Sequence, residues 1–259
     1  MWIQQPGEIN EHLIILGTIQ NMIYLVKGER YMLIGGGALW MVHEFEKQVN
    51  EAGLDMDRIQ YLVIGHTHYD HCTAVPYIQK RYPHIKVLAS HAAEKLFDRE
   101  NTVRHIRAFT RYVMEYLGLP NELEGVSLDF DDIHITQTLR EGDRVDLGSG
   151  LGFEVYETPG HSRCSITLYE PRQNWLFPSD SLAWPFPGRH VGEYAPTVFD
   201  GFEVYLNSLN KLIPLKTRLC GWEHYGAFTD EEAEDIVTSV IRYTLAEGFE
   251  LRESQSTYK

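Results

Sequence analysis

Residues 59–72 read IQYLVIGHTHYDHC, in which an apolar run is followed at once by three histidines and an aspartate. The near-continuous apolar part predicts a buried β-strand, and the polar part would form a turn at its carboxyl end. Imidazole and carboxylate at this density are the usual ligands of zinc, iron and manganese. Without a cation, clustering His66, His68, Asp70 and His71 would bring together repelling or unsatisfied groups. The stretch therefore predicts a metal site on a turn that follows a strand.

Three later turns offer further metal ligands. His161 lies in ETPGHS, Asp180 in LFPSD and His224 in GWEHYG, and each follows an apolar, strand-like run. Alternate residues of a turn can point to one side, so His66 and His68 could share one ion while Asp70 and His71 serve another. Two ions need more than four ligands, and these three residues are the candidates for the remainder.

The surrounding sequence alternates between strand and helix patterns, which indicates layers of helix around sheet. The predicted strands cover residues 12–19, 21–28, 31–36, 59–65, 85–90, 152–158, 164–170, 174–179 and 217–221. The predicted helices cover residues 39–53, 73–83, 91–118 (one helix or two), 200–213 with Asp200 as N-cap, and a segment after Thr229. Residues 119–132 and 183–199 are predicted loops.

Length and composition indicate an ordinary globular protein. The chain has 259 residues, of which 43% are hydrophobic and 23% are charged, and we expect residues 1–259 to form a single domain. A net charge of −14 argues against nucleic acid as a partner, and no apolar run reaches the roughly 18 residues of a membrane span. The N-terminus has no signal-peptide pattern, and Cys72, Cys164 and Cys220 include no close pair. We therefore expect a cytoplasmic protein with reduced thiols and a small-molecule substrate, and the sequence leaves open a monomer or a homodimer.

The order of the candidate ligands resembles a known family. The pattern His66-x-His68-x-Asp70-His71, followed by later histidine and aspartate residues at strand ends, resembles the metallo-β-lactamase superfamily of hydrolases from about residue 12 to residue 226. The resemblance implies a four-layer αββα sandwich, with a helical insertion around residues 91–118 and a two-metal site along one edge. Carried over, it assigns His66, His68 and His161 to a first metal, Asp70, His71 and His224 to a second, and Asp180 to a bridge between them.

Three positions depart from the pattern of that family. Gly35, in LIGGG, stands where an acidic residue usually ends the third strand and supports the site. Ser179 replaces the glycine that normally precedes the bridging aspartate, and Glu223 replaces a small residue before the last histidine. Glu223 is either a carboxylate that orients a metal ligand or a solvated side chain.

Several branches of the family remain open. Flavodiiron oxygen reductases carry glutamate at the position of His68, so this histidine favours hydrolysis. The segments HYDHC, VLAS and VFDGFEVYLNSLNKL resemble the quinolone-signal response proteins, thioesterases that act on 2-aminobenzoylacetyl-CoA. This resemblance implies hydrolysis of a thioester or related small ester. The alternatives are a mononuclear iron persulfide dioxygenase, a lactonase or phosphodiesterase, and a non-catalytic metal-binding signalling protein.

The resemblance also implies a mechanism. Two divalent ions, zinc first and iron or manganese as alternatives, would lower the pKa of a shared water to give a bridging hydroxide. Asp180 would bridge the ions, and Asp70 would accept the proton of the water. Tyr69, Tyr194 and Tyr225 are possible proton donors to a leaving group.

The substrate-binding residues are harder to read from sequence. Trp184, Phe186 and Tyr194, on the loop after Asp180, are candidates to line an apolar pocket or simply to anchor that loop. Helical spacing places three arginines on one face, opposite Ile106, Phe109 and Val113. This face is either a clamp for an anionic group or a solvated surface. The three arginines are Arg104, Arg107 and Arg111.

Overall fold

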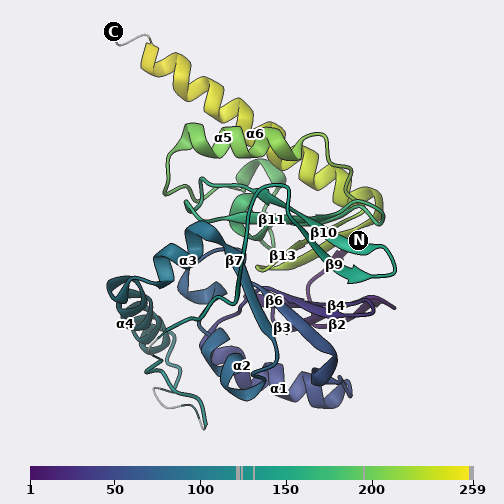
Figure 1. Cartoon of the computed structure of the whole chain (residues 1–259). Helices are drawn as coiled ribbons and strands as arrows, with labels where there is room; N and C mark the ends of the chain where they lie inside the picture. Colours follow the sequence, from purple (N-terminus) through teal and green to yellow (C-terminus); the bar gives the residue numbers. More distant parts are fainter. Residues whose placement is uncertain (121–122, 124, 131, 195, 257–259) are drawn as a thin grey trace.

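The computed structural model describes residues 1–120, 123, 125–130, 132–194 and 196–256, and within them the chain forms two seven-stranded sheets packed face to face (Figure 1). The N-terminal sheet has the order β2 (Gly7–Asn10), β3 (Leu13–Thr18), β4 (Asn21–Lys27), β5 (Tyr31–Ile34), β6 (Ile59–Val63), β7 (Lys86–Ser90) and β8 (Gln137–Leu139). The C-terminal sheet has the order β1 (Trp2–Ile3), β14 (Gly226–Thr229), β13 (Leu219–Trp222), β12 (Trp175–Phe177), β11 (Ile166–Glu170), β10 (Leu151–Glu157) and β9 (Arg144–Gly148).

Helices cover the outer face of each sheet (Figure 1). The helices over the N-terminal sheet are α1 (Val42–Glu51), α2 (Val75–Arg81), α3 (His91–Phe97) and α4 (Glu100–Tyr116). The helices over the C-terminal sheet are α5 (Phe202–Leu212) and α6 (Asp230–Ser256). The predicted four-layer αββα architecture is confirmed.

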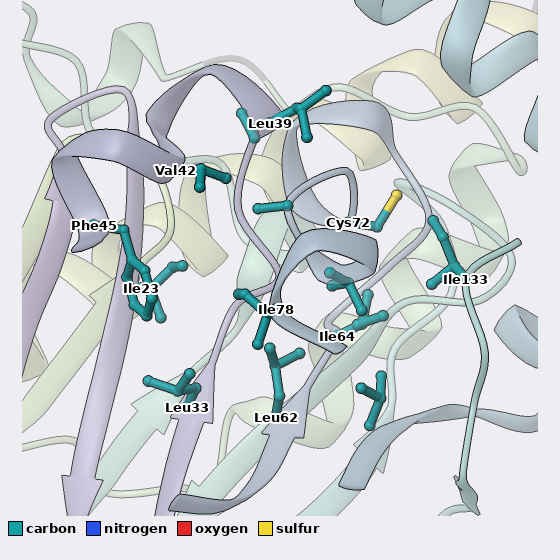
Figure 2. Packing of buried hydrophobic residues seen from close by; sticks show 14 of the residues in the cluster. Ile23, Leu33, Leu39, Val42, Phe45, Leu62, Ile64, Cys72, Ile78 and Ile133 are labelled. Carbon is teal, nitrogen blue, oxygen red and sulfur yellow. The ribbon is translucent and has the colours of Figure 1, made fainter. Parts of the chain in front are cut away.

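The strands read as continuously apolar because both of their faces are buried. In β3, Leu13 and Ile15 point between the sheets, whereas Ile14 and Leu16 point toward the helices. Figure 2 shows the helix-side cluster, in which Ile23, Leu33 and Leu62 of three neighbouring strands lie beneath the helices α1 and α2. Burial on two faces gives each strand about twice the hydrophobic stabilisation of a half-exposed strand.

A group of hydrogen bonds joins the two sheets beside the β3–β4 turn. The amide of Met22 donates to the carbonyl of Glu223 over 2.7 Å, and the amide of Tyr225 donates to the carbonyl of Ile19 over 2.8 Å. The buried hydroxyl of Tyr24 donates to the carbonyl of Trp222 over 2.6 Å. We call these contacts the inter-sheet seam, and they fix the segment 222–225 against the N-terminal sheet.

Several elements differ from the sequence-based expectation. The sequence left open one helix or two over residues 91–118, and the structure has two, with Asp98 and Arg99 between α3 and α4. The strands β1, β2, β8, β9 and β14 were not predicted. The helix α5 begins after Gly201, which has φ +104°, so the prediction of Asp200 as N-cap is wrong. The side chain of Asp200 instead faces Arg163, with 3.4 Å between Oδ1 and Nη2.

The three cysteines are buried and free. Among the helices of the described residues, none combines the length and the apolar character that a bilayer span requires.

Candidate metal centre

Each candidate ligand lies just beyond the end of a strand, and all of them meet at one edge of the sandwich. The turn after β6 carries His66, His68, Asp70 and His71, and the short 3₁₀ turn Tyr69–His71 sets the directions of the last two side chains. From the C-terminal sheet, His161 follows β10, Asp180 follows β12 and His224 follows β13. Both sheets therefore contribute polar groups to the same place, although these residues lie far apart in the sequence.

The first donor set consists of His66, His68 and His161. The Nε2 atom of His161 lies 3.2 Å from Nε2 of His66 and 2.9 Å from Nδ1 of His68. Three imidazole nitrogens thus converge on one point, which is the arrangement that a tetrahedral metal ion requires of three of its ligands.

The second donor set consists of Asp70, His71 and His224. The Nε2 atoms of His71 and His224 lie 3.0 Å apart, and Oδ2 of Asp70 lies 3.7 and 3.5 Å from them, respectively. This set combines two imidazoles with one carboxylate. It lies beside the first set, because the ring centroids of His66 and His71 are only 4.1 Å apart.

Asp180 lies between the two sets. Its Oδ2 atom is 3.4 Å from Nε2 of His161 in the first set. The same atom is 3.4 Å from Nε2 of His71 and 3.6 Å from Nε2 of His224 in the second set. Its other oxygen, Oδ1, is buried and has no hydrogen-bond partner among the described residues. A single carboxylate oxygen therefore faces both donor sets, and the second carboxylate oxygen is left unsatisfied.

Backbone carbonyls fix the tautomers of two histidines. Nδ1 of His161 contacts the carbonyl of Thr197 at 2.7 Å, and Nδ1 of His224 contacts the carbonyl of Gln20. A carbonyl can only accept, so each Nδ1 carries the proton and donates it. In the neutral rings, Nε2 of both histidines is consequently a lone pair directed at the centre.

Side chains fix the tautomers of two more histidines. Nδ1 of His71 lies 2.9 Å from Oε2 of Glu223, a carboxylate that accepts. The hydroxyl of Ser179 donates to Oε1 of Glu223 over 2.7 Å, so its oxygen accepts from Nδ1 of His66 at 3.0 Å. Nε2 of His66 and His71 is then also a lone pair, because each Nδ1 holds the proton.

These tautomers show that the residues fit a bound cation. In the neutral forms of the rings, the lone pairs on Nε2 of His71 and His224 face each other at 3.0 Å, and those of His66 and His161 face each other at 3.2 Å. Opposed lone pairs repel, and the buried unpaired oxygen of Asp180 adds negative charge without compensation. A positive ion in each set removes both costs, and neutral imidazole with carboxylate is the donor chemistry of divalent transition metals.

The pKa values of the site have clear physical causes. Burial holds the pKa of His66 well below its usual value and lowers the pKa of His68 to about 4, so both rings are neutral at neutral pH. Burial also acts to lower the pKa of His71, but Asp180, Asp70 and Glu223 raise it overall. Burial acts to raise the pKa of Asp180, but the imidazoles of His71 and His224 lower it. The carboxylates around the second set therefore attract positive charge.

The loop after Asp180 places two of its three predicted pocket residues near the centre. The ring of Trp184 lies 5.3 Å from that of His224, and the ring of Phe186 lies 4.9 Å from that of Tyr225. Tyr194 packs against the hydrophobic cluster over the C-terminal sheet, and its hydroxyl donates to the carbonyl of Arg189 over 3.4 Å. The assignment of all three to a substrate pocket stays a prediction.

The predicted arginines contact their own chain. Arg104 donates to Asn101, Arg107 donates to the carbonyl of Phe130 over 2.9 Å, and Arg111 forms an ion pair with Asp129. Arg107 and Arg111 therefore connect α4 to the segment at 129–130, and an anion-binding role for them stays a prediction.

The expectation that Phe109 lies on the buried face of α4 is wrong. The buried residues of this helix are Val103, Ile106, Thr110 and Met114, whereas Phe109 is 49% exposed. Its ring packs against Tyr69, with 4.8 Å between the centroids, so Phe109 borders the turn that carries the candidate ligands.

Sequence reasoning missed Phe199. This side chain is 71% exposed, yet its ring centroid lies 5.5 Å from that of His68 and 5.7 Å from that of His161. The residue ends the loop 183–199, and the amide of Phe199 donates to the carbonyl of Gly160 over 3.0 Å. The sequence contains no periodic signal for this contact, because a loop residue is placed by tertiary hydrogen bonds.

Comparisons with known proteins agree with this geometry. The family model for the metallo-beta-lactamase superfamily matches residues 16–224. The metallo-beta-lactamase fold-containing protein ST1585 of Sulfurisphaera tokodaii is 24% identical over 225 residues, which cover 85% of this chain and 78% of that protein. A hydroxyacylglutathione hydrolase of Legionella pneumophila is 27% identical over 170 residues, which cover 64% of this chain and 49% of that protein, so the chain matches about half the length of that relative.

Solved structures share the fold. The crystal structure of ST1585 superposes with a TM-score of 0.67 at 22% identity and covers 90% of this chain and 86% of its own. The Rm3 metallo-beta-lactamase superposes with a TM-score of 0.69 at 15% identity and covers 97% of this chain and 96% of its own. The family model covers most of the chain and ends at the last candidate ligand, His224. The chain therefore belongs to the metallo-beta-lactamase superfamily.

Proposed function

We propose that this protein is a dinuclear metal hydrolase that acts on a thioester or a related small ester with an apolar acyl group. The observation that carries the proposal is the position of Asp180, whose Oδ2 lies 3.4 Å from Nε2 of both His161 and His71 and so faces two donor sets. One mononuclear site would leave the other set with opposed lone pairs and no cation. Two divalent ions use all of these groups.

The chain's own residues divide the remaining work. Divalent cations held by the two sets supply charge that lowers the pKa of a water and polarises a carbonyl. Asp70 borders the second set and is partly accessible, with 17% of its side chain exposed, so it is placed to accept a proton from a water in the cleft. Asp180 is 6% exposed at its side chain and would offer a carboxylate oxygen to both cations. Four of the five histidines direct a lone pair inward because Nδ1 of each donates to another group; these are His66, His71, His161 and His224.

Aromatic side chains on both sides of the centre favour an apolar substrate group. Phe199 borders His68 and His161, Trp184 borders His224, and Phe109 extends from Tyr69. Phe199 and Phe109 are 71% and 49% exposed, which leaves aromatic surface available beside the candidate ligands. An acyl chain or ring that covers these faces would gain roughly 25 cal/mol for each Å² of apolar surface removed from water.

Two arguments support a thioester as the substrate. A thiol has a pKa of about 8.5, so a thiolate leaves with little help from a general acid. The relative in Legionella pneumophila carries the name hydroxyacylglutathione hydrolase, and its match spans 64% of this chain. His68 completes a donor set with two other imidazoles, which is consistent with hydrolysis.

A substrate panel tests the proposal. Initial rates would be measured on acyl-CoA and glutathione thioesters with short aliphatic and aromatic acyl groups, on a lactone, on a β-lactam and on a phosphodiester. Each assay would contain zinc, manganese or iron(II), and oxygen uptake with glutathione persulfide would be measured in parallel. We expect thiol release from one thioester class, with two metal equivalents bound per chain.

The other outcomes assign the alternatives. Turnover of the lactone or phosphodiester alone would retain the two-metal chemistry and overturn the thioester assignment. Oxygen uptake with one iron per chain would indicate the persulfide dioxygenase instead. Two bound metals with no turnover of any substrate would favour the non-catalytic signalling protein.

A further inference from the structure

The three departures from the family pattern lie in contact with one another. Gly35 follows β5, Ser179 follows β12 and Glu223 follows β13, so they come from both sheets. A Cβ atom added to Gly35 would lie only 2.9 Å from Oε2 of Glu223, which no side chain could tolerate without displacing the carboxylate. The hydroxyl of Ser179 donates to the other oxygen of Glu223 over 2.7 Å. The glycine thus creates the space that the carboxylate of Glu223 occupies.

Both oxygens of Glu223 are directed at histidines of the centre. Oε2 contacts Nδ1 of His71, in the second donor set, at 2.9 Å. Oε1 contacts Ser179, whose oxygen accepts from Nδ1 of His66, in the first donor set, at 3.0 Å. Glu223 is 3% exposed, so these contacts are shielded from water and are correspondingly strong.

The backbone of Ser179 gives an independent indication. Its φ of +51° lies in the left-handed region, where a glycine would be less strained. Strain of this kind persists where the surrounding contacts require the side chain. Here the hydroxyl is the only link between Glu223 and His66 among the contacts of the described residues, and glycine would remove it.

We propose that Glu223 is a positioning residue that takes over the role of the acidic side chain absent at position 35, and that it supports both donor sets at once. It acts on His71 directly and on His66 through Ser179. A carboxylate that accepts from the outer nitrogen of a ligating histidine holds its tautomer and raises its basicity. The proposal rests on the metal binding of the proposed function and is independent of the substrate class.

The variants Glu223→Gln and Ser179→Gly separate the two links. The amide of a glutamine at position 223 presents one acceptor and one donor, so it cannot accept from both His71 and Ser179. Ser179→Gly removes only the link to His66 and also relieves the backbone strain. Glu170→Gln is the matched control, because Glu170 is also buried but accepts from the amide of Gln173, within its own turn.

Metal affinity would be measured by competition with a chelator, and the visible absorption of the cobalt(II)-loaded proteins would report the geometry of each site. We expect Glu223→Gln to weaken metal binding by about 10- to 100-fold and to alter the cobalt spectrum. Ser179→Gly should weaken one of the two equivalents while the melting temperature of the metal-free protein stays equal or rises. Glu170→Gln should leave affinity and spectrum unchanged.

The possible failures are distinguishable. If the unaltered protein binds no metal, the proposed function fails and the inference fails with it. If the unaltered protein binds two equivalents, and Glu223→Gln retains the same affinity and the same cobalt spectrum, the positioning role of Glu223 is wrong while the proposed function stands. A loss of melting temperature in metal-free Glu223→Gln with unchanged metal affinity would assign Glu223 a purely structural role, which also overturns the inference.

Discussion

The two sheets contribute to the metal centre in different ways. The N-terminal sheet supplies His66, His68, Asp70 and His71 from one turn of six residues, whereas the C-terminal sheet supplies three groups from three separate turns. The first group shares one stretch of backbone, which includes the 3₁₀ turn at Tyr69–His71, although His66 and His71 also contact Ser179 and Glu223 of the C-terminal sheet. Each member of the second group requires its own tertiary support.

The supports of the second group come from distant segments. His161 donates to the carbonyl of Thr197, on the long loop, and His224 donates to the carbonyl of Gln20, at the β3–β4 turn. Asp180 has no such partner for Oδ1 within the described residues. The N-terminal ligands are therefore neighbours in the sequence, whereas the C-terminal ligands come together only when three separate turns pack against them.

The largest effect should follow from changing the residue that faces both sets. We expect Asp180→Asn to reduce hydrolysis by on the order of a hundredfold or more and to weaken both metal equivalents, since ligand changes exceed the 10- to 100-fold effects of supporting residues. Asp70→Asn should weaken one equivalent only, because Asp70 faces His71 and His224. Metal content per chain and initial rates measure both effects.

The control for these variants is Asp146→Asn, a surface carboxylate on β9 that faces Arg30 at 3.3 Å. It should retain full activity and both metals. If Asp180→Asn and Asp70→Asn each lost one metal equivalent only, the bridging role of Asp180 would be wrong. The N-terminal and C-terminal halves of the site would then differ less than we infer.

Metal removal should affect the C-terminal half more than the N-terminal half. Chelation leaves the opposed lone pairs and the carboxylates without a cation. A metal ion present at about 1,000 times its dissociation constant adds about 4 kcal/mol to the free energy of unfolding, so its removal should lower the melting temperature of a domain of this size by about 10 °C. Calorimetry with and without chelator measures the shift. In the metal-free protein, the backbone amides of residues 159–163 should then exchange with solvent faster than those of residues 64–72. The opposite order would show that the N-terminal half of the site depends more on the metal.

Changes to the aromatic border should have intermediate effects. Phe199→Ala removes a ring beside His68 and His161, and Phe109→Ala removes one beside Tyr69. We expect Phe199→Ala to raise KM for an aromatic thioester by about 2- to 10-fold with little change in kcat, consistent with about 0.5–1.5 kcal/mol for an aromatic contact. A matched acetyl thioester is the control substrate, and an equal change for both substrates would remove the pocket assignment of Phe199.

The smallest effect concerns the arginines of α4. Arg107 already donates to the carbonyl of Phe130, so we expect Arg107→Glu to lower the free energy of unfolding by about 1 kcal/mol and to leave KM for an acyl-CoA unchanged. Denaturant unfolding and steady-state kinetics measure the two quantities. A clear rise of KM for the CoA ester, without a rise for a neutral thioester, would instead support an anion clamp.

The sequence predicts those parts of the fold in which one physical signal dominates. Residues 59–72 combine a doubly buried strand with contiguous ligands, so both the strand and the cluster were predictable. The strand β9 was missed because the alternation of its buried positions, Val145 and Leu147, with exposed ones extends over only five residues. Phe109 was placed on the wrong face because helical periodicity does not reveal that Tyr69 covers part of its ring.

Contacts between distant residues were not predictable in the same way. Gly35, Ser179 and Glu223 each stand out in the sequence as unusual, but only the packing of β5, β12 and β13 shows that they form one unit. A pattern of residues along the chain carries information about neighbours in sequence, whereas this unit depends on the distance between strand ends in two sheets.

The inter-sheet seam has a consequence for motion. Hydrogen bonds from Met22 and Tyr225 fix the segment 222–225 to the N-terminal sheet, and the buried hydroxyl of Tyr24 adds a third. An opening of the ligand-bearing edge would therefore have to break these hydrogen bonds or leave the segment 222–225 in place. His224 lies in this segment, so in the proposed hydrolase it would stay in place while substrate enters and product leaves.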